Sequence, residues 1–158
     1  CSSDLVSATH AVNKLVCIFI VFYVHRVGNN VDFLHFFIIG SRKIASAATS
    51  TYEIGNPVYP PARQKLAEYG IDCAGKTARQ ITKRDYDYYD YIVAMDQSNI
   101  RNLKNMLSND PQGKISLLMD YTSRPADVAD PWYTGDFQAT WDDVSEGCEA
   151  LLKFIMKK

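Results

Sequence analysis

Short apolar runs alternate with longer amphipathic stretches through the second half of this chain. Residues 91–95 and 115–119 are mostly apolar runs of the length typical of buried strands. Between them, residues 98–107 have the spacing of a helix, with Asp96 or Ser98 as its candidate N-cap. Strands that alternate with helices predict an α/β fold, in which helices cover both faces of a parallel sheet. Ligands of such folds bind beyond the carboxyl ends of the strands.

Two further helices flank this alternation. Two prolines begin the stretch at residue 60, and Gly70 lies just past its end, which is the order typical of a helix. We expect the last helix to begin near Thr140, with Asp142 and Asp143 in its first turn, where acidic side chains favour the helix dipole. Its apolar residues recur every three or four positions and predict one buried face: Trp141, Val144, Cys148, Leu151, Leu152 and Ile155.

Length and composition exclude several classes of protein. The 158 residues suit one domain, residues 1–158, and the net charge of −1 provides no basic surface for nucleic acid. No apolar run reaches the ~18 residues of a membrane span, and residues 15–24 lack the cleavage site of a signal peptide. The four cysteines form no Cys-x-x-Cys pair, and the three histidines have no carboxylate cluster at ligand spacing. We therefore expect reduced thiols, a cytoplasmic location and no metal.

The composition changes abruptly between Ala45 and Ser46. The first 45 residues hold all three histidines and five of the seven phenylalanines, but no proline, methionine or glutamate. Residues 15–24 and 33–39 read as strands, yet no helix is visible between them, although a parallel pair needs a crossover. Either these strands form a hairpin, or wrong residue identities hide the helix. The chain resembles two sequences of different origin joined at one point.

A carboxylic acid precedes a proline and two aromatic rings in Asp130-Pro131-Trp132-Tyr133. An enzyme that protonates a leaving group while it holds a flat aromatic substrate needs these groups together. The structural alternative is a turn-starting aspartate, because Asp-Pro commonly begins turns. Trp132 and Tyr133 would then be core aromatics.

Residues 46–158 closely resemble the low-molecular-weight protein tyrosine phosphatases. The resemblance is carried by residues 46–57, 78–82, 90–96, 98–101 and 130–133. It implies a four-stranded parallel sheet with helices on both faces, a three-layer Rossmann- or flavodoxin-like arrangement. It also implies hydrolysis of phosphotyrosine through a cysteinyl phosphate, without a cofactor. The implied partners are phosphotyrosine proteins, aryl phosphates and phosphate-like anions.

Several residues match functional positions of that family. Asp130 matches the general acid, Trp132 and Tyr133 match the aromatic pair beside the substrate ring, and Tyr52 matches another wall of the cleft. Two residues match positions that support the phosphate-binding loop, with ordinary strand-end polar residues as the alternative: Ser46 and Asp96.

The phosphate-binding loop itself has no match. The family signature, Cys-x5-Arg-(Ser/Thr), follows the first strand, but residues 1–45 contain no Cys-x5-Arg. Cys17 is the best candidate nucleophile, although residue 23 is Tyr where arginine is required, and a buried strand thiol is its alternative role. Cys73 and Arg79 fit the spacing, but no full strand precedes them, so we interpret residues 73–79 as a non-catalytic connector.

Three hypotheses remain open. The chain is an active phosphatase whose first 45 residues are misreported, for example through a shifted reading frame, or it is a phosphatase fold without a nucleophile that binds a partner. The third is different chemistry on the same fold, such as arsenate reduction or phosphoarginine hydrolysis. Against it, no cysteine lies between Cys73 and Cys148, and the Trp-Tyr pair favours a flat aryl substrate.

Overall fold

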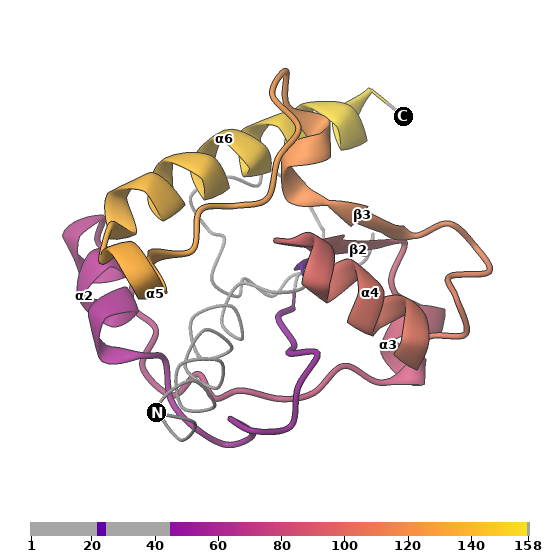
Figure 1. Ribbon diagram of the computed structural model, residues 1–158, viewed down its shortest axis with the longest axis horizontal. Helices are drawn as coiled ribbons and strands as arrows, with labels where there is room; N and C mark the ends of the chain where they lie inside the picture. Colours follow the sequence, from indigo (N-terminus) through magenta and orange to yellow (C-terminus); the bar gives the residue numbers. More distant parts are fainter. Residues whose placement is uncertain (1–21, 25–44, 158) are drawn as a thin grey trace.

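A computed structural model of the chain describes residues 22–24 and 45–157 (Figure 1). Its elements, in chain order, are β1 (Phe22–Val24), α2 (Pro60–Glu68), α3 (Lys83–Tyr88), β2 (Tyr91–Ala94), α4 (Gln97–Met106), β3 (Ile115–Leu117), the 3₁₀ helix η1 (Leu118–Tyr121), α5 (Pro131–Thr134) and α6 (Phe137–Met156). The strands and helices expected from residues 60 onward are all present. The single domain over residues 1–158 stays a prediction.

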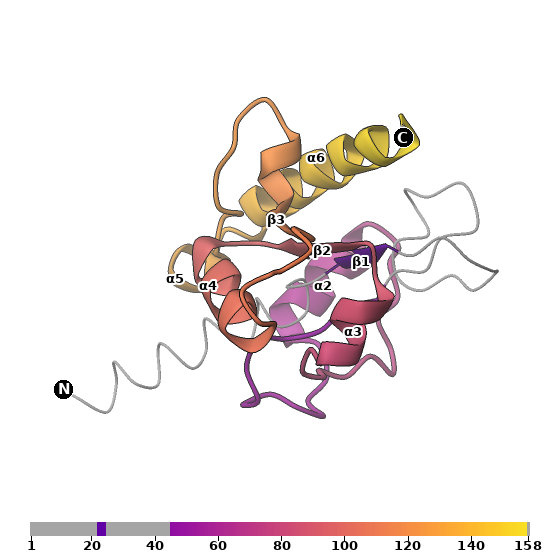
Figure 2. The same cartoon turned by 90° about the vertical axis from the view of Figure 1, so that its right-hand side faces the viewer.

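Strand β2 is the centre of a three-layer arrangement. Successive side chains of a strand point to opposite faces, and here Ile92 and Ala94 pack in the cluster that holds the α4 residue Leu103. Val93 packs on the other face, in the cluster formed with α6 residues such as Val144. Figure 2 shows α6 on one side of the sheet and α3 with α4 on the other. The α/β class with helices on both faces is therefore confirmed.

The strands that the structure describes form a sheet in the order β1-β2-β3. β2 and β3 are parallel, with Ile92 opposite Ile115, as predicted. β1 is antiparallel to β2, with Phe22 opposite Val93, which differs from the predicted all-parallel sheet. An apolar run shows only that a strand is buried, whereas the connection between strands sets its direction. A fourth strand stays a prediction.

The boundaries of α6 and β3 differ most from those expected. α6 begins at Phe137, because the Asp136 side chain accepts the Ala139 N–H at 2.9 Å and forms the N-cap. With 3.6 residues per turn, Asp142 and Asp143 lie in its second turn instead of the first. β3 ends at Leu117 and does not reach residue 119, because the chain turns into η1.

Helix α6 buries one face, as its spacing predicts. Val144, Cys148 and Leu151 are buried, and Gly147 lies against Leu118 of η1. Near its start, Trp141 stacks on Tyr69 with ring centroids 3.7 Å apart. Within the described residues no helix, including the 20-residue α6, has the length and apolar character of a membrane span.

Candidate active site

A pocket of about 360 Å³ lies at the carboxyl end of β2. Its lining comes from residues 95–98 with Arg101, from residues 127–131, and from Thr140 and Val144 of α6. It is thus placed between the N-terminus of α4 and the segment that leads into α5. This is where an α/β fold is expected to bind its ligand.

Three carboxylates gather at this pocket: Asp96, Asp127 and Asp130. Burial raises the pKa of Asp96, and the charges of Asp127 and Asp130 raise it further. Its hydrogen bond from the Asn99 N–H, at 2.6 Å, favours the ionised form but does not cancel these effects. The same bond makes Asp96 the N-cap of α4, which confirms one of the two candidates.

Residues 127–130 form a segment that we call the acid segment, because it ends on Asp130. The Asp127 side chain accepts the Gln97 N–H at 3.1 Å, which ties the segment to the start of α4. The Val128 N–H donates to the Met95 carbonyl at 2.9 Å, just beyond β2. Asp130 then directly precedes the first residue of α5.

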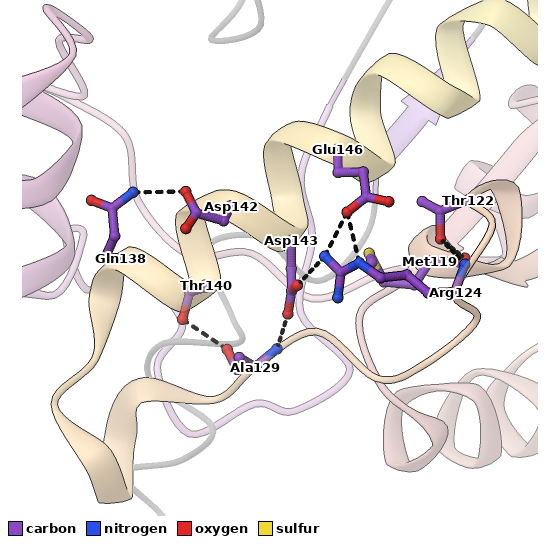
Figure 3. Close-up of polar contacts among 9 residues, drawn as sticks. All are labelled: Met119, Thr122, Arg124, Ala129, Gln138, Thr140, Asp142, Asp143 and Glu146. Atoms are coloured by element: carbon purple, nitrogen blue, oxygen red, sulfur yellow. Dashed lines mark hydrogen bonds and ion pairs between the residues drawn. The ribbon is translucent and has the colours of Figure 1, made fainter.

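Helix α6 binds Ala129, which lies between Val128 and Asp130 in the acid segment, at its N–H and at its carbonyl oxygen (Figure 3). The Ala129 N–H donates to Asp143 Oδ2 at 2.9 Å, and Thr140 Oγ1 donates to the Ala129 carbonyl at 2.7 Å. Both side chains are thus directed at the backbone immediately before Asp130.

The other oxygen of Asp143 is also occupied. Arg124 Nη2 donates to Asp143 Oδ1 at 2.7 Å, and Arg124 Nε donates to Glu146 Oε2 at 2.8 Å (Figure 3). Arg124 is itself half exposed, with 53% of its side chain accessible, whereas Asp143 is only 13% accessible. Arg124 therefore ties the chain just before the acid segment to α6.

Sequence reasoning missed the roles of Thr140 and Asp143. It assigned Asp143 to a helix-dipole effect and gave Thr140 no side-chain role. The available signal was their spacing of three, which places two polar side chains on one helix face beside the buried Val144.

Comparison with known proteins identifies the family. Residues 39–158 match the family model described as low molecular weight phosphotyrosine protein phosphatase. The chain belongs to this family. The match begins seven residues before Ser46, so the family sequence extends slightly into the region that we expected to be unrelated.

Individual members of the family agree with this assignment. The chain is 40% identical over 121 residues to the low molecular weight protein-tyrosine-phosphatase YfkJ of Bacillus subtilis, covering 75% of this chain and 78% of that protein. The chicken (Gallus gallus) low molecular weight phosphotyrosine protein phosphatase is 39% identical, covering 70% and 73%. The crystal structure of YfkJ superposes with a TM-score of 0.66, over 70% of this chain and 71% of that one.

The structure brings two of the residues matched to this phosphatase family to the pocket, Asp96 and Asp130. Ser46 is exposed and Tyr52 is 63% exposed, and neither is part of the pocket lining that the described residues form. The backbones of Trp132 and Tyr133 belong to α5, but their side chains lie outside what the structure describes, as does Cys17.

The two cysteines in the described part of this phosphatase are free thiols, and both are buried. Cys73 packs with Ala62 and Leu66 of α2, and its pKa is raised by burial. Cys148 lies on α6, where burial raises its pKa to about 12. Neither lines the pocket. Within the described residues, His, Cys, Asp and Glu form no group of three or more that could hold a metal.

Proposed function

We propose that this protein hydrolyses phosphotyrosine in proteins, or aryl phosphates, through a cysteinyl phosphate, with Asp130 as the general acid. The observation that carries the proposal is the position of Asp130 in the pocket at the carboxyl end of β2, next to Asp96. Membership of the low molecular weight phosphatase family supports the same reaction. No cofactor is needed for it.

The reaction has two steps. In the first, a cysteine thiolate attacks phosphorus, the bond from phosphorus to the tyrosine oxygen breaks, and that oxygen takes the proton of Asp130 as it leaves. In the second, the Asp130 carboxylate accepts a proton from water, whose oxygen attacks phosphorus. The phosphorus–sulfur bond then breaks, releasing phosphate and restoring both the thiolate and the acid.

The remaining matched residues belong to the same proposal. Trp132, Tyr133 and Tyr52 would hold the tyrosine ring, because aromatic faces bind flat rings well. Two polar residues would support the phosphate-binding loop: Ser46 and Asp96. A cytoplasmic location is part of the proposal too, supported by the free thiols of Cys73 and Cys148.

The nucleophile is expected among the first 45 residues. A thiolate must form near neutral pH to attack, and the raised pKa values of Cys73 and Cys148 oppose this. Cys17, the best candidate by sequence, lies outside the described residues.

A second candidate function is partner binding without catalysis. Residue 23, where the signature counted from Cys17 requires arginine, is Tyr23, a residue of β1 that pairs with Ile92 of β2. A chain with these residues lacks a phosphate clamp, and its pocket would bind a ligand without cleaving it.

Turnover of aryl phosphates separates the two functions. We expect release of phosphate from phenyl phosphate, with kcat/KM reduced ~10²- to 10⁴-fold by Asp130→Asn. The loss should be smaller for nitrophenyl phosphate, whose leaving group needs less protonation. Unchanged turnover in Asp130→Asn would contradict the role of Asp130. No turnover by the parent chain, under conditions in which it is folded, would favour the binding function.

A further inference from the structure

The two hydrogen bonds from α6 to Ala129 restrain both peptide groups around that residue. Its N–H, 2.9 Å from Asp143, belongs to the peptide shared with Val128. Its carbonyl, 2.7 Å from Thr140, belongs to the peptide shared with Asp130. Because a peptide group is planar, a fixed Ala129 carbonyl also fixes the direction in which the Asp130 backbone begins.

The two α6 side chains are themselves well held. Thr140 is buried, at 9% exposure, and Asp143 is bound through its other oxygen by Arg124 at 2.7 Å. Both come from a helix of 20 residues whose apolar face is packed against the sheet. Groups supported in this way keep a neighbouring functional side chain in its working position.

We propose that Asp143 and Thr140 are positioning residues of the phosphatase reaction, which hold the acid segment so that Asp130 faces the pocket. Neither takes or gives the proton; both act through Asp130. The proposal rests on the proposed function of Asp130 as the general acid.

If Thr140 and Asp143 position the general acid, variants that remove either contact should lose kcat/KM to an extent that depends on the leaving group. A misplacement of about 1 Å in a catalytic group can cost on the order of 10²-fold in rate. A displaced general acid matters most when the leaving oxygen is basic, as in phenol with a pKa of ~10. It matters least for a nitrated phenol, which leaves readily as an anion. A defect in folding or substrate binding would lower the rates for both substrates equally.

The variants come in matched pairs. Thr140→Val removes the hydroxyl donor and keeps the side-chain shape, whereas Thr140→Ser keeps the donor. Asp143→Ala removes the acceptor for the Ala129 N–H. Asp142→Ala is its control, because it changes the adjacent aspartate, whose carboxylate accepts a hydrogen bond from Gln138 at 2.7 Å (Figure 3). Asp130→Asn is the reference for a missing acid. The measurement is kcat/KM for phenyl phosphate and for nitrophenyl phosphate with each purified full-length variant.

We expect Thr140→Val and Asp143→Ala to lose about 10-fold or more on phenyl phosphate and less than about 3-fold on nitrophenyl phosphate, within the range of general acid catalysis. Asp142→Ala should behave as the parent, and Thr140→Ser should recover the rate on phenyl phosphate that Thr140→Val loses. If Asp130→Asn shows this selective loss and the two α6 variants lose equally on both substrates or not at all, the positioning role is overturned while the proposed function stands. If Asp130→Asn has no selective loss, or the parent has no turnover, the proposed function fails and the positioning role fails with it.

Hydrogen exchange at the Ala129 amide gives a second readout that needs no turnover. The amide should be protected in the parent and in Asp142→Ala, and should exchange faster in Asp143→Ala while the amides of β2 stay protected. Equal protection in Asp143→Ala would overturn the positioning role of Asp143.

Discussion

Asp96 and Asp130 line the same pocket, one as the N-cap of α4 and the other immediately before α5. Their proximity is visible in the raised pKa of Asp96, which burial causes first and to which the charges of Asp127 and Asp130 add. A carboxyl with a raised pKa is destabilising once it is ionised. Ionisation of Asp96 in this pocket therefore costs folding stability.

Replacing Asp96 by Asn should stabilise the fold at pH 7. The pKa of Asp96 is raised in the folded state. The stability that the protonated side chain contributes is therefore fully present below the unfolded-state pKa, and it is lost as the pH rises through the folded-state pKa. Asn is also a good N-cap but carries no charge, so an Asn at position 96 avoids this loss of stability at neutral pH. Urea unfolding should give Asp96→Asn the higher free energy of unfolding at pH 7, with a smaller difference below about pH 3.9. A less stable variant at pH 7 would contradict the electrostatic account of the pocket.

Gly147 should not tolerate even one extra methyl group. A Cβ built on Gly147 lies 2.5 Å from Leu118 Cγ, and Leu118 is fully buried. Overpacking costs ~1–3 kcal/mol and exceeds the ~1 kcal/mol that Ala gains over Gly in a helix. Gly147→Ala should therefore lower the free energy of unfolding. In a Leu118→Ala background the same change should stabilise by about 0.5–1 kcal/mol, because only the propensity effect remains. Destabilisation in both backgrounds would refute the contact.

The described thiols should be inert in the folded protein. Cys148 has a pKa of about 12 and Cys73 a raised pKa, and only the thiolate reacts readily. At pH 8 an aromatic disulfide reagent should modify neither residue until urea unfolds the chain. Cys73→Ser should also leave phosphatase activity intact. Complete loss of activity in this variant, with folding preserved, would transfer the nucleophile's role to residues 73–79.

Tyr86 should contribute to stability through its hydroxyl. This hydroxyl donates to Asp110 Oδ1 at 2.7 Å and accepts the Gln112 N–H at 2.8 Å, on a side chain that is 3% exposed. Tyr86→Phe leaves that N–H without this acceptor and should cost about 1–2 kcal/mol. Tyr69→Phe is the matched control, because the Tyr69 hydroxyl makes one exposed bond of 3.3 Å to Gln138. Thermal unfolding should show a clear drop only for Tyr86→Phe, and equal drops would argue against the buried network.

Much of the fold after residue 60 could be predicted because its signals are local. The apolar run before Asp96, the cap at Asp96 and the two prolines that open α2 each reflect interactions among near neighbours in the chain. The place of the pocket could be predicted as well, because ligands of α/β folds bind beyond the carboxyl ends of the strands and Asp96 follows such a strand in the sequence.

The rest depends on contacts between distant parts of the chain. The antiparallel pairing of β1 with β2, in which Phe22 lies opposite Val93, depends on how the chain connects the two strands, and no local pattern encodes that connection. The support of Ala129 by Thr140 and Asp143 joins a loop to a helix, and each residue alone looks like an ordinary polar position. The start of α6 was predicted too late because Asp136, and not a residue near Thr140, provides the cap.

The most direct test of the account is to trap the phosphorylated enzyme. The full-length protein would be mixed with an aryl phosphate, quenched in acid and mapped by mass spectrometry across residues 1–45, which also reads the identity of every residue there. The account predicts a phosphate on a cysteine of this region, with Cys17 as the candidate. Turnover without a phosphorylated cysteine there, or with the phosphate on Cys73 or Cys148, would contradict it.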